Sequence, residues 1–239
     1  KTESIWRRQL ESAMDAGFLH TDDWTEANWR RFSIKQMQDA VLLSMLNNPE
    51  GLDILEVGGG HSRTLPHLVE NNRCTNADPV EGSGHGPVGV DPDAVKWRHV
   101  FRAMGDTSED LADASFDVVY SISVIEHVDT ADFPRVFGDM ARVLRPGGRM
   151  IHLVDTYLQD FDRDNAWGLS LCNPLRAILL NGLVQATGDI LSNEDVFFRG
   201  AYATNPDTTM RVWNQMAPEI APVRLSGQAC SYIFEARKP

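Results

Sequence analysis

The stretch LDILEVGGGHS, residues 52–62, decides the fold. It opens with a run of strand length, continues into three glycines, and is followed by a helical stretch. A strand, a glycine turn and a helix N-terminus together place backbone N–H groups and a positive dipole end against a ligand. Glycines are needed there because a side chain would block that approach. The stretch therefore predicts a ligand-binding loop at the carboxyl end of the first strand.

Further strand-like runs follow, and helical patterns separate them. The runs lie at residues 73–77, 97–103, 116–122 and 149–154. A helix with one apolar face is expected over residues 130–145, where a Pro-Gly-Gly turn ends it. Two last runs, 221–225 and 229–236, are split by Ser226-Gly227 and predict an antiparallel hairpin. The pattern favours an α/β fold with a doubly wound, mostly parallel sheet and an antiparallel C-terminal hairpin.

The remaining segments predict the domain organisation. Residues 1–50 are expected to form an N-terminal helical extension, and residues 51–239 the ligand-binding domain. A helical insert is expected at about 156–200, with one helix that begins at Asn173 and ends at Gly188. Ligand choice should lie in the extension and the insert, because segments carried on a rigid scaffold provide specificity.

Composition excludes several classes of function. The 239 residues carry 34 acidic and 22 basic side chains, a net charge of −12 that repels nucleic-acid phosphates. No window approaches 18 consecutive apolar residues, so no membrane span is expected. The cysteines are odd in number and far apart, at Cys74, Cys172 and Cys230, which argues against a disulfide scaffold. This usage fits a reducing compartment, and we expect the cytoplasm.

The glycine loop can be compared with three kinds of nucleotide site. A GxxxxGK[ST] phosphate loop is excluded because the chain contains no Gly-Lys pair. A GxGxxG dinucleotide loop would need glycine where Arg63 stands, and no tyrosine has the lysine four positions on that a short-chain dehydrogenase carries. The remaining pattern is E-x-G-x-G. It resembles motif I of the class I S-adenosylmethionine-dependent methyltransferases, which have a Rossmann-like fold.

Later landmarks match the same family in order. In the resemblance, Asp78, 22 residues after Glu56, accepts both ribose hydroxyls, a pairing that suits a two-oxygen acceptor. Asp91 is a rival for that role. Asp106 would meet the adenine amine, and residues 116–128 and 144–148 match the fourth-strand motif and the turn after the next helix. The implied cofactor-binding residues are Glu56, Gly58, Gly59, Gly60, Asp78, Asp106, Thr107, Ser121 and Ser123.

Methyl transfer to a hydroxyl needs a base close to the acceptor. Ligands in such sheets bind beyond the carboxyl ends of the strands, which selects residues just after the fourth and fifth strands. His127 and Asp155 are the candidates, although each could instead be a turn residue. His152 and Asp155 should face opposite sides of their strand and form no dyad.

A metal ion is not expected. The pair Glu126-His127 also resembles the metal-assisted O-methyltransferases, which place a further glutamate three residues earlier. Ser123 stands at that position, and two ligands alone make a poor cation site.

The sequence thus predicts an S-adenosylmethionine-dependent methyltransferase that methylates a hydroxyl of a small metabolite, sugar or polyketide-like acceptor. Two alternatives stay open: a non-catalytic module that binds S-adenosylmethionine, and a nicotinamide-dependent oxidoreductase. Neither the acceptor nor the oligomeric state can be predicted, because the likeness concerns the fold and the cofactor.

Overall fold

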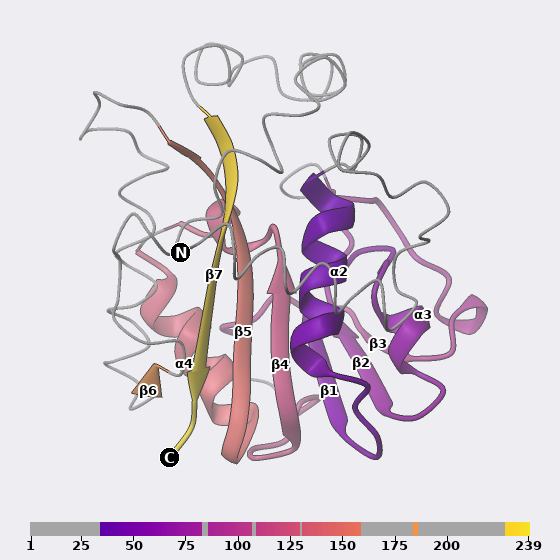
Figure 1. Cartoon of the computed structure of the whole chain (residues 1–239). Helices are drawn as coiled ribbons and strands as arrows, with labels where there is room; N and C mark the ends of the chain where they lie inside the picture. Colours follow the sequence, from indigo (N-terminus) through magenta and orange to yellow (C-terminus); the bar gives the residue numbers. More distant parts are fainter. Residues whose placement is uncertain (1–33, 83–85, 107–108, 130, 159–183, 186–227) are drawn as a thin grey trace. The chain divides into compact units, whose positions relative to one another are not determined.

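The computed structural model describes residues 34–82, 86–106, 109–129, 131–158, 184–185 and 228–239 (Figure 1). The chain divides into two compact units. The first unit comprises residues 1–48, 155–169 and 191–233, and the second comprises residues 49–154, 170–190 and 234–239. In the described ranges no helix is long and apolar enough to cross a membrane.

A single sheet in the order β3-β2-β1-β4-β5-β7-β6 forms the framework. The strands are β1 (Asp53–Val57), β2 (Arg73–Ala77), β3 (Arg98–Val100), β4 (Phe116–Ile122), β5 (Leu144–Leu158), β6 (Val184–Gln185) and β7 (Gln228–Arg237). Strands β1 to β5 pair in parallel, and β6 pairs antiparallel with β7. The predicted α/β class, with a mostly parallel sheet and an antiparallel C-terminal pair, is confirmed.

The strand order reverses direction at β1. The chain leaves β1 towards β2 and β3, and then returns to the other side of β1 to place β4 and β5. A ligand in an open α/β sheet binds in the crevice at such a point, outside the carboxyl ends of the strands. That point lies here between β1 and β4, where the glycine loop begins.

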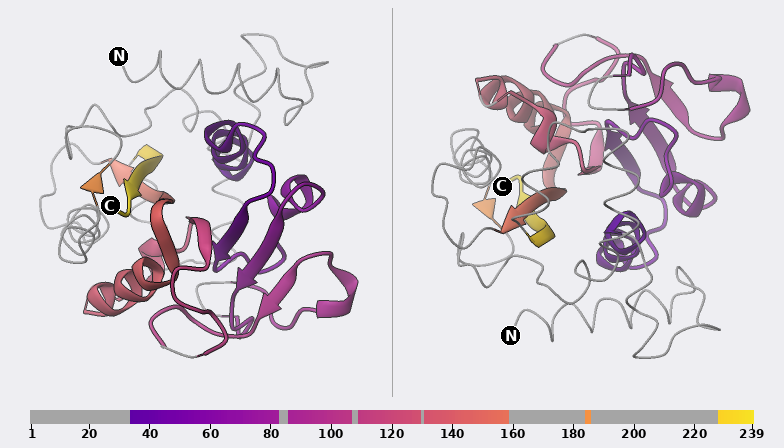
Figure 2. Two further views of the ribbon diagram at one scale, coloured as in Figure 1. Left: turned by 90° about the horizontal axis from the view of Figure 1, so that it is seen from below. Right: turned by 90° about the horizontal axis from the view of Figure 1, so that it is seen from above.

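In the second unit, helices α3 (Leu65–Leu68) and α4 (Phe133–Val143) cover opposite faces of the sheet (Figure 2). Helix α4 (Phe133–Val143) buries Phe133, Phe137 and Met140, the apolar face that the sequence predicted. It ends two residues before the predicted end, because Leu144 already belongs to β5. The expected turn at 144–148 instead forms the irregular start of β5, where the pairing with β4 shifts register. There Lys238 exchanges backbone hydrogen bonds with Gly147 and Gly148.

Helix α3 (Leu65–Leu68) begins next to Thr64, in the helical stretch expected after the glycine loop. Pro66 is tolerated because it lies in the first turn, where no intrahelical N–H donor is needed. The hydroxyl of Ser62 accepts a hydrogen bond from the Leu65 N–H group at 3.0 Å. This serine sets the start of the helix that follows the glycine loop.

Between β2 and β3 the described residues form one short 3-10 helix, η3 (Pro92–Ala94), in place of a full crossover helix. The chain from Val80 to Gly89 turns back on itself, with a Glu81–Val88 bridge and a Gly89 N–H bond to the Val80 carbonyl. Over the described residues, the connection from β2 to β3 is therefore mainly a loop.

Helix α2 (Ile34–Leu46) belongs to the first unit. It ends where Asn47 and Asn48 adopt left-handed backbone angles with φ of 56° and 51°. The helix expected from Asn173 to Gly188 is wrong at Val184–Gln185, which pair as β6 with the edge of β7. Edge pairing, which is not a local property, overrides the helical pattern there. The other predicted helices of 1–33 and 156–200, and the strand at 221–225, lie outside the described residues.

Candidate active site

The glycine loop adopts a conformation that requires glycine. Gly58 and Gly60 have φ angles of +67° and +52°. A Cβ atom on Gly58 would lie 2.7 Å from Cγ2 of Val124, which follows β4, and one on Gly60 would lie 2.8 Å from the Pro87 ring. The loop is therefore packed tightly between the end of β4 and the segment that follows β2.

The N–H groups of the three glycines are bonded inside the protein. Gly58 donates to the Ala77 carbonyl at 2.8 Å, and Gly60 donates to Oδ2 of Asp78 at 2.8 Å. Gly59 donates to Oδ1 of Asn76 at 3.1 Å. The expectation that these N–H groups point at a ligand is wrong for this structure. These bonds to the end of β2 fix the shape of the loop, and glycine is needed because protein atoms already occupy the place of each Cβ atom.

Asn76 is a loop-shaping residue that the sequence analysis missed. Its Oδ1 accepts from Gly59, its Nδ2 donates to the Gly60 carbonyl at 2.9 Å, and the residue is fully buried. Buried polar groups of this kind are usually held by hydrogen bonds. The sequence offers one sign of this role: Asn76 is the only amide side chain in a strand whose other buried positions are Cys74, Thr75 and Ala77.

Asp78 follows β2 directly and lies beside the glycine loop. Its Oδ2 accepts from Gly60 at 2.8 Å and its Oδ1 from the Val80 N–H group at 2.7 Å. Nε2 of His99 lies 3.0 Å from the Asp78 carbonyl oxygen. Each carboxylate oxygen has two lone pairs, so each can accept one more hydrogen bond.

The rival carboxylate, Asp91, lies elsewhere. It caps helix η3, where its Oδ1 accepts from the Asp93 N–H group at 3.0 Å, and it is exposed. Because Asp91 lies far along the loop after β2 and its carboxylate caps η3, we favour Asp78 over Asp91 as the carboxylate of the candidate site.

Glu56 lies beneath the loop rather than on its surface. The residue is buried, and a Cβ atom on Gly59 would come 2.4 Å from the Glu56 carboxyl carbon. The Thr64 hydroxyl donates to Oε1 of Glu56 at 3.3 Å and lies 2.8 Å from the Tyr120 hydroxyl. This buried cluster joins β1, the start of α3 and β4 under the glycines.

Two predicted cofactor-binding residues, Ser121 and Ser123, lie at the end of β4 in different surroundings. Ser121 is fully buried, and its hydroxyl lies 2.6 Å from Nδ1 of His152 on β5. Burial lowers the pKa of His152 to about 3, so this imidazole is neutral near pH 7. The Ser121 side chain thus belongs to the core. Ser123 lies beyond the strand with φ of 55°, one residue before the Val124 that touches Gly58.

His127 ends the short helix η4 (Ile125–His127), which follows β4 at the same edge of the sheet. The residue is exposed, and its N–H group donates to the Val124 carbonyl at 2.9 Å. Val124 therefore links His127 to the glycine loop: its carbonyl accepts from the His127 N–H group, and its side chain packs against Gly58. Asp155 belongs to the first unit, where its carboxylate accepts from Nζ of Lys35 at 2.7 Å and from Nε2 of Gln38 at 2.6 Å.

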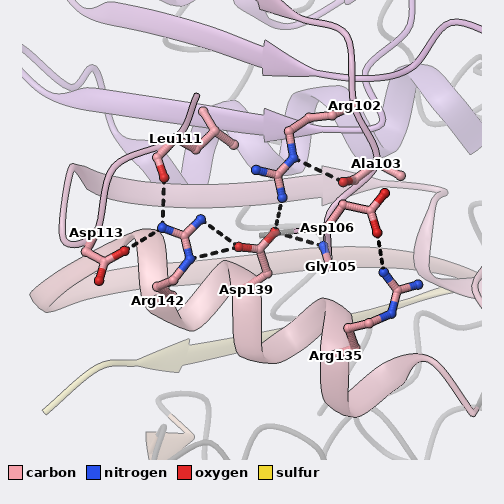
Figure 3. A network of polar contacts seen from close by, with 9 residues as sticks. All are labelled: Arg102, Ala103, Gly105, Asp106, Leu111, Asp113, Arg135, Asp139 and Arg142. Atoms are coloured by element: carbon pink, nitrogen blue, oxygen red, sulfur yellow. Dashed lines mark hydrogen bonds and ion pairs between the residues drawn. The ribbon is translucent and has the colours of Figure 1, made fainter. Parts of the chain in front are cut away.

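Asp106 lies in the loop after β3, and its side chain is 72% exposed. Its Oδ1 lies 2.6 Å from Nη1 of Arg135 on α4 (Figure 3). The next predicted residue, Thr107, lies outside the described residues.

The comparisons with known proteins fit this geometry. A family model for the methyltransferase domain matches residues 29–182, a range that includes the glycine loop and the ends of β2, β3 and β4. The chain belongs to the methyltransferase-domain family. The resemblance to the class I S-adenosylmethionine-dependent methyltransferases is thereby confirmed, and S-adenosylmethionine is the cofactor of that class.

A curated relative of this chain is the ubiquinone biosynthesis O-methyltransferase of Rhizobium leguminosarum bv. trifolii, 35% identical over 105 residues. The match covers 41% of this chain and 38% of the relative, so it spans about two-fifths of each protein.

Solved structures show the shared fold. The geranyl diphosphate C-methyltransferase of Streptomyces coelicolor A3(2) has a TM-score of 0.57 and 15% identity, over 86% of this chain and 79% of that one. The phosphoethanolamine N-methyltransferase 2 of Haemonchus contortus has a TM-score of 0.59 and 12% identity, over 93% of this chain and 60% of that one. A [4+2]-cyclase, SpnF, has a TM-score of 0.57 and 15% identity, over 88% and 85%. One fold thus carries C-methylation, N-methylation and a cyclisation, so it does not select an acceptor.

Proposed function

We propose that this methyltransferase binds S-adenosylmethionine at the crevice between β1 and β4 and transfers a methyl group to a hydroxyl of a small molecule. The observation that carries the proposal is the placement of Asp78. It follows β2 directly and accepts a hydrogen bond from Gly60 of the glycine loop, and it is the residue to which the sequence resemblance assigns the ribose.

The residues at the crevice fit the cofactor. The two oxygens of Asp78 can each accept one more hydrogen bond, which matches the two donors of a ribose diol. The glycines at 58–60 permit the backbone angles and the tight packing of the loop beside Asp78. Asp106 is exposed on the loop after β3 and can accept a hydrogen bond from the adenine amine. Ser123, at the end of β4, is proposed for the amino-acid end of the cofactor.

The chemistry of the bound group is simple: S-adenosylmethionine supplies a methyl group on a positively charged sulfur. The chain must align the acceptor oxygen with that methyl group and remove its proton. We assign proton removal to His127, because a neutral imidazole accepts a proton near pH 7 and this one lies just after β4. Asp155 stays a prediction for the same role, and its carboxylate already accepts from Lys35 and Gln38.

An oxygen acceptor is supported by the curated relative, whose name is that of an O-methyltransferase. A small acceptor is supported by the structural neighbours, whose names refer to geranyl diphosphate and phosphoethanolamine. A nucleic-acid acceptor is disfavoured by the net charge of −12.

Calorimetric titration with S-adenosylhomocysteine tests cofactor binding. We expect micromolar affinity for the wild type, and a loss of tenfold or more in Asp78→Asn, which turns a ribose acceptor into a donor. Asp91→Asn is the matched control and should bind like the wild type, as should the protein with NAD(H) present in excess. Loss of binding in Asp91→Asn but not in Asp78→Asn would overturn the assignment.

Methyl transfer from labelled S-adenosylmethionine to a panel of small hydroxylated, aminated and carbon acceptors tests the reaction. Oxygen acceptors should be labelled, and His127→Gln should lower kcat by about 10²-fold or more while S-adenosylhomocysteine binds unchanged. Binding without transfer to any acceptor would favour a non-catalytic module. Labelling of nitrogen or carbon alone would exclude O-methylation.

A further inference from the structure

Two residues one turn apart on α4 hold the loop that contains Asp106 (Figure 3). Arg135 donates from Nη1 to Oδ1 of Asp106 at 2.6 Å. Asp139 accepts from the N–H group of the preceding residue, Gly105, at 2.8 Å. Side chains four residues apart lie on one face of a helix, so α4 grips adjacent residues of the loop from one side.

The two contacts differ in burial. The Asp139 carboxylate is 1% exposed and also accepts from Arg102 and Arg142, so it belongs to a buried polar network. The side chains of Arg135 and Asp106 are 49% and 72% exposed. An ion pair this exposed adds little to stability. Asp139 therefore stabilises the packing of α4 against the loop. The ion pair between Arg135 and Asp106 contributes little to stability, which leaves it available for a role in ligand binding.

The orientation of Arg135 is fixed from two further sides. Its Nη2 and Nε donate to Oδ1 of Asp132, at 3.2 and 3.4 Å, so the guanidinium spans two carboxylates. A Cβ atom on Gly105 would lie 2.9 Å from Nη1 of Arg135, so the guanidinium lies directly against the glycine. Gly105 has φ of +103°, a conformation that L side chains rarely adopt. The loop is thus shaped to receive this arginine.

We propose that Arg135 is a positioning residue that sets the selectivity of the site for adenine through Asp106. The inference rests on the proposed function, in which Asp106 accepts a hydrogen bond from the adenine amine. Arg135 occupies Oδ1 of Asp106 and so leaves the other carboxylate oxygen to face the base. A carboxylate held in this way accepts from an amine and repels a carbonyl oxygen at the same position.

The test compares two ligands, S-adenosylhomocysteine and S-inosylhomocysteine, in which a carbonyl replaces the adenine amine. The wild type should bind the adenine compound at least tenfold more tightly. In Arg135→Gln this ratio should fall threefold or more, and Arg135→Lys, which keeps the charge without the fork, should restore part of it. The melting temperature of Arg135→Gln should stay close to that of the wild type, because the pair is exposed.

The matched control is Lys96→Gln, which removes a lysine from another exposed ion pair, with Glu70. It makes the same charge change and should leave the ligand ratio unchanged. If Arg135→Gln binds both ligands with the wild-type ratio of affinities, this inference is wrong and the proposed function still stands. A wild type that binds neither ligand overturns the proposed function, and this inference with it.

Discussion

Asn76 acts on the site through the backbone. Its amide makes two hydrogen bonds to the glycine loop, one as acceptor and one as donor. An aspartate at this position would lose the donor and bury a charge, and an apolar residue would lose both bonds. Few side chains can replace it, although it is two residues away from the carboxylate proposed to bind the ribose.

We expect Asn76→Ala to lower the free energy of unfolding by about 2–4 kcal/mol, because it leaves buried backbone groups of Gly59 and Gly60 without partners. It should also weaken binding of S-adenosylhomocysteine about tenfold or more, as the loop loses its shape. Urea unfolding and calorimetry measure the two effects.

Asn72→Ala is the control for this variant. Asn72 lies before β2, at the opposite end from Asn76, and bonds the backbone of Leu52, Pro49 and Leu68. Its loss should destabilise the protein without changing cofactor affinity. Equal losses of affinity in both variants would show that stability alone, and not loop shape, controls binding.

Cys74 should be chemically inert in the folded protein. Burial, together with the nearby Glu56, raises the pKa of its thiol to about 12, and the thiolate is the reactive form. In the native protein at pH 8 we expect labelling of Cys74 by iodoacetamide to be at least tenfold slower than in urea, measured by peptide mass spectrometry. Equal rates in both states would contradict the burial of this side chain.

At the scale of elements, six of the seven strands overlap runs that the sequence predicted, and β6 does not. The limits of β2 and β4 match the predicted runs. Strand β4 is a mostly apolar run, as expected for a buried parallel strand, whereas β2 is more polar. Strand β6 could not be predicted, since two residues gain their structure only from the edge of β7. The end of α4 was misplaced because β5 begins earlier than its apolar run.

The candidate site divides in a similar way. The glycines and Asp78 could be identified because their spacing follows the order of strands and loops. Asn76 and Arg135 could not, because each acts on a segment that is distant in sequence or on backbone atoms alone. Ser121 was taken for a site residue from its place at the end of β4, but strand alternation turns its side chain towards His152.

Helix α4 is anchored to the loop after β3 by a buried carboxylate. Asp139 accepts from Arg102, Arg142 and the Gly105 N–H group, and both arginines keep other partners. Asp139→Asn keeps the shape but removes the negative charge between two cations. We expect a loss of about 2–4 kcal/mol in the free energy of unfolding, since a buried arginine is left without its counter-charge.

Thermal and urea unfolding of Asp139→Asn measure this loss, with Asp132→Asn as the control. Asp132 makes an exposed pair with Arg135 on the same helix, and its loss should change stability by less than about 1 kcal/mol. Equal effects of the two variants would contradict the distinction between the buried and exposed parts of the network.

At the scale of the molecule, His152 and Asp53 are two of the described groups that contribute to the response to acid. His152 titrates at about pH 3 when folded and at its ordinary value of 6.5 when unfolded, so the unfolded chain takes up the proton first. Stability is therefore complete above pH 6.5 and falls as the pH drops towards 3. This one group should cost about 2 kcal/mol between pH 7 and pH 5.

Asp53 acts in a lower window. Arg73, and with it Arg145, lowers the pKa of its carboxyl from 3.8 to about 2, so its contribution is present above pH 3.8 and is lost as the pH falls towards 2. Urea unfolding from pH 7 to pH 4 should show a flatter slope in His152→Asn and an unchanged slope in Asp53→Asn. A wild-type slope in His152→Asn would show that other groups control the loss.

The hydrogen bonds inside the glycine loop also bear on how fast the cofactor arrives and leaves. Amides at Gly58, Gly59 and Gly60 that are bonded to the end of β2 should exchange slowly with deuterium in the ligand-free protein. A loop already ordered in this way has no folding step to complete when a nucleoside enters. Association should then proceed in a single kinetic phase, and exchange at these three amides should change little when the ligand is added.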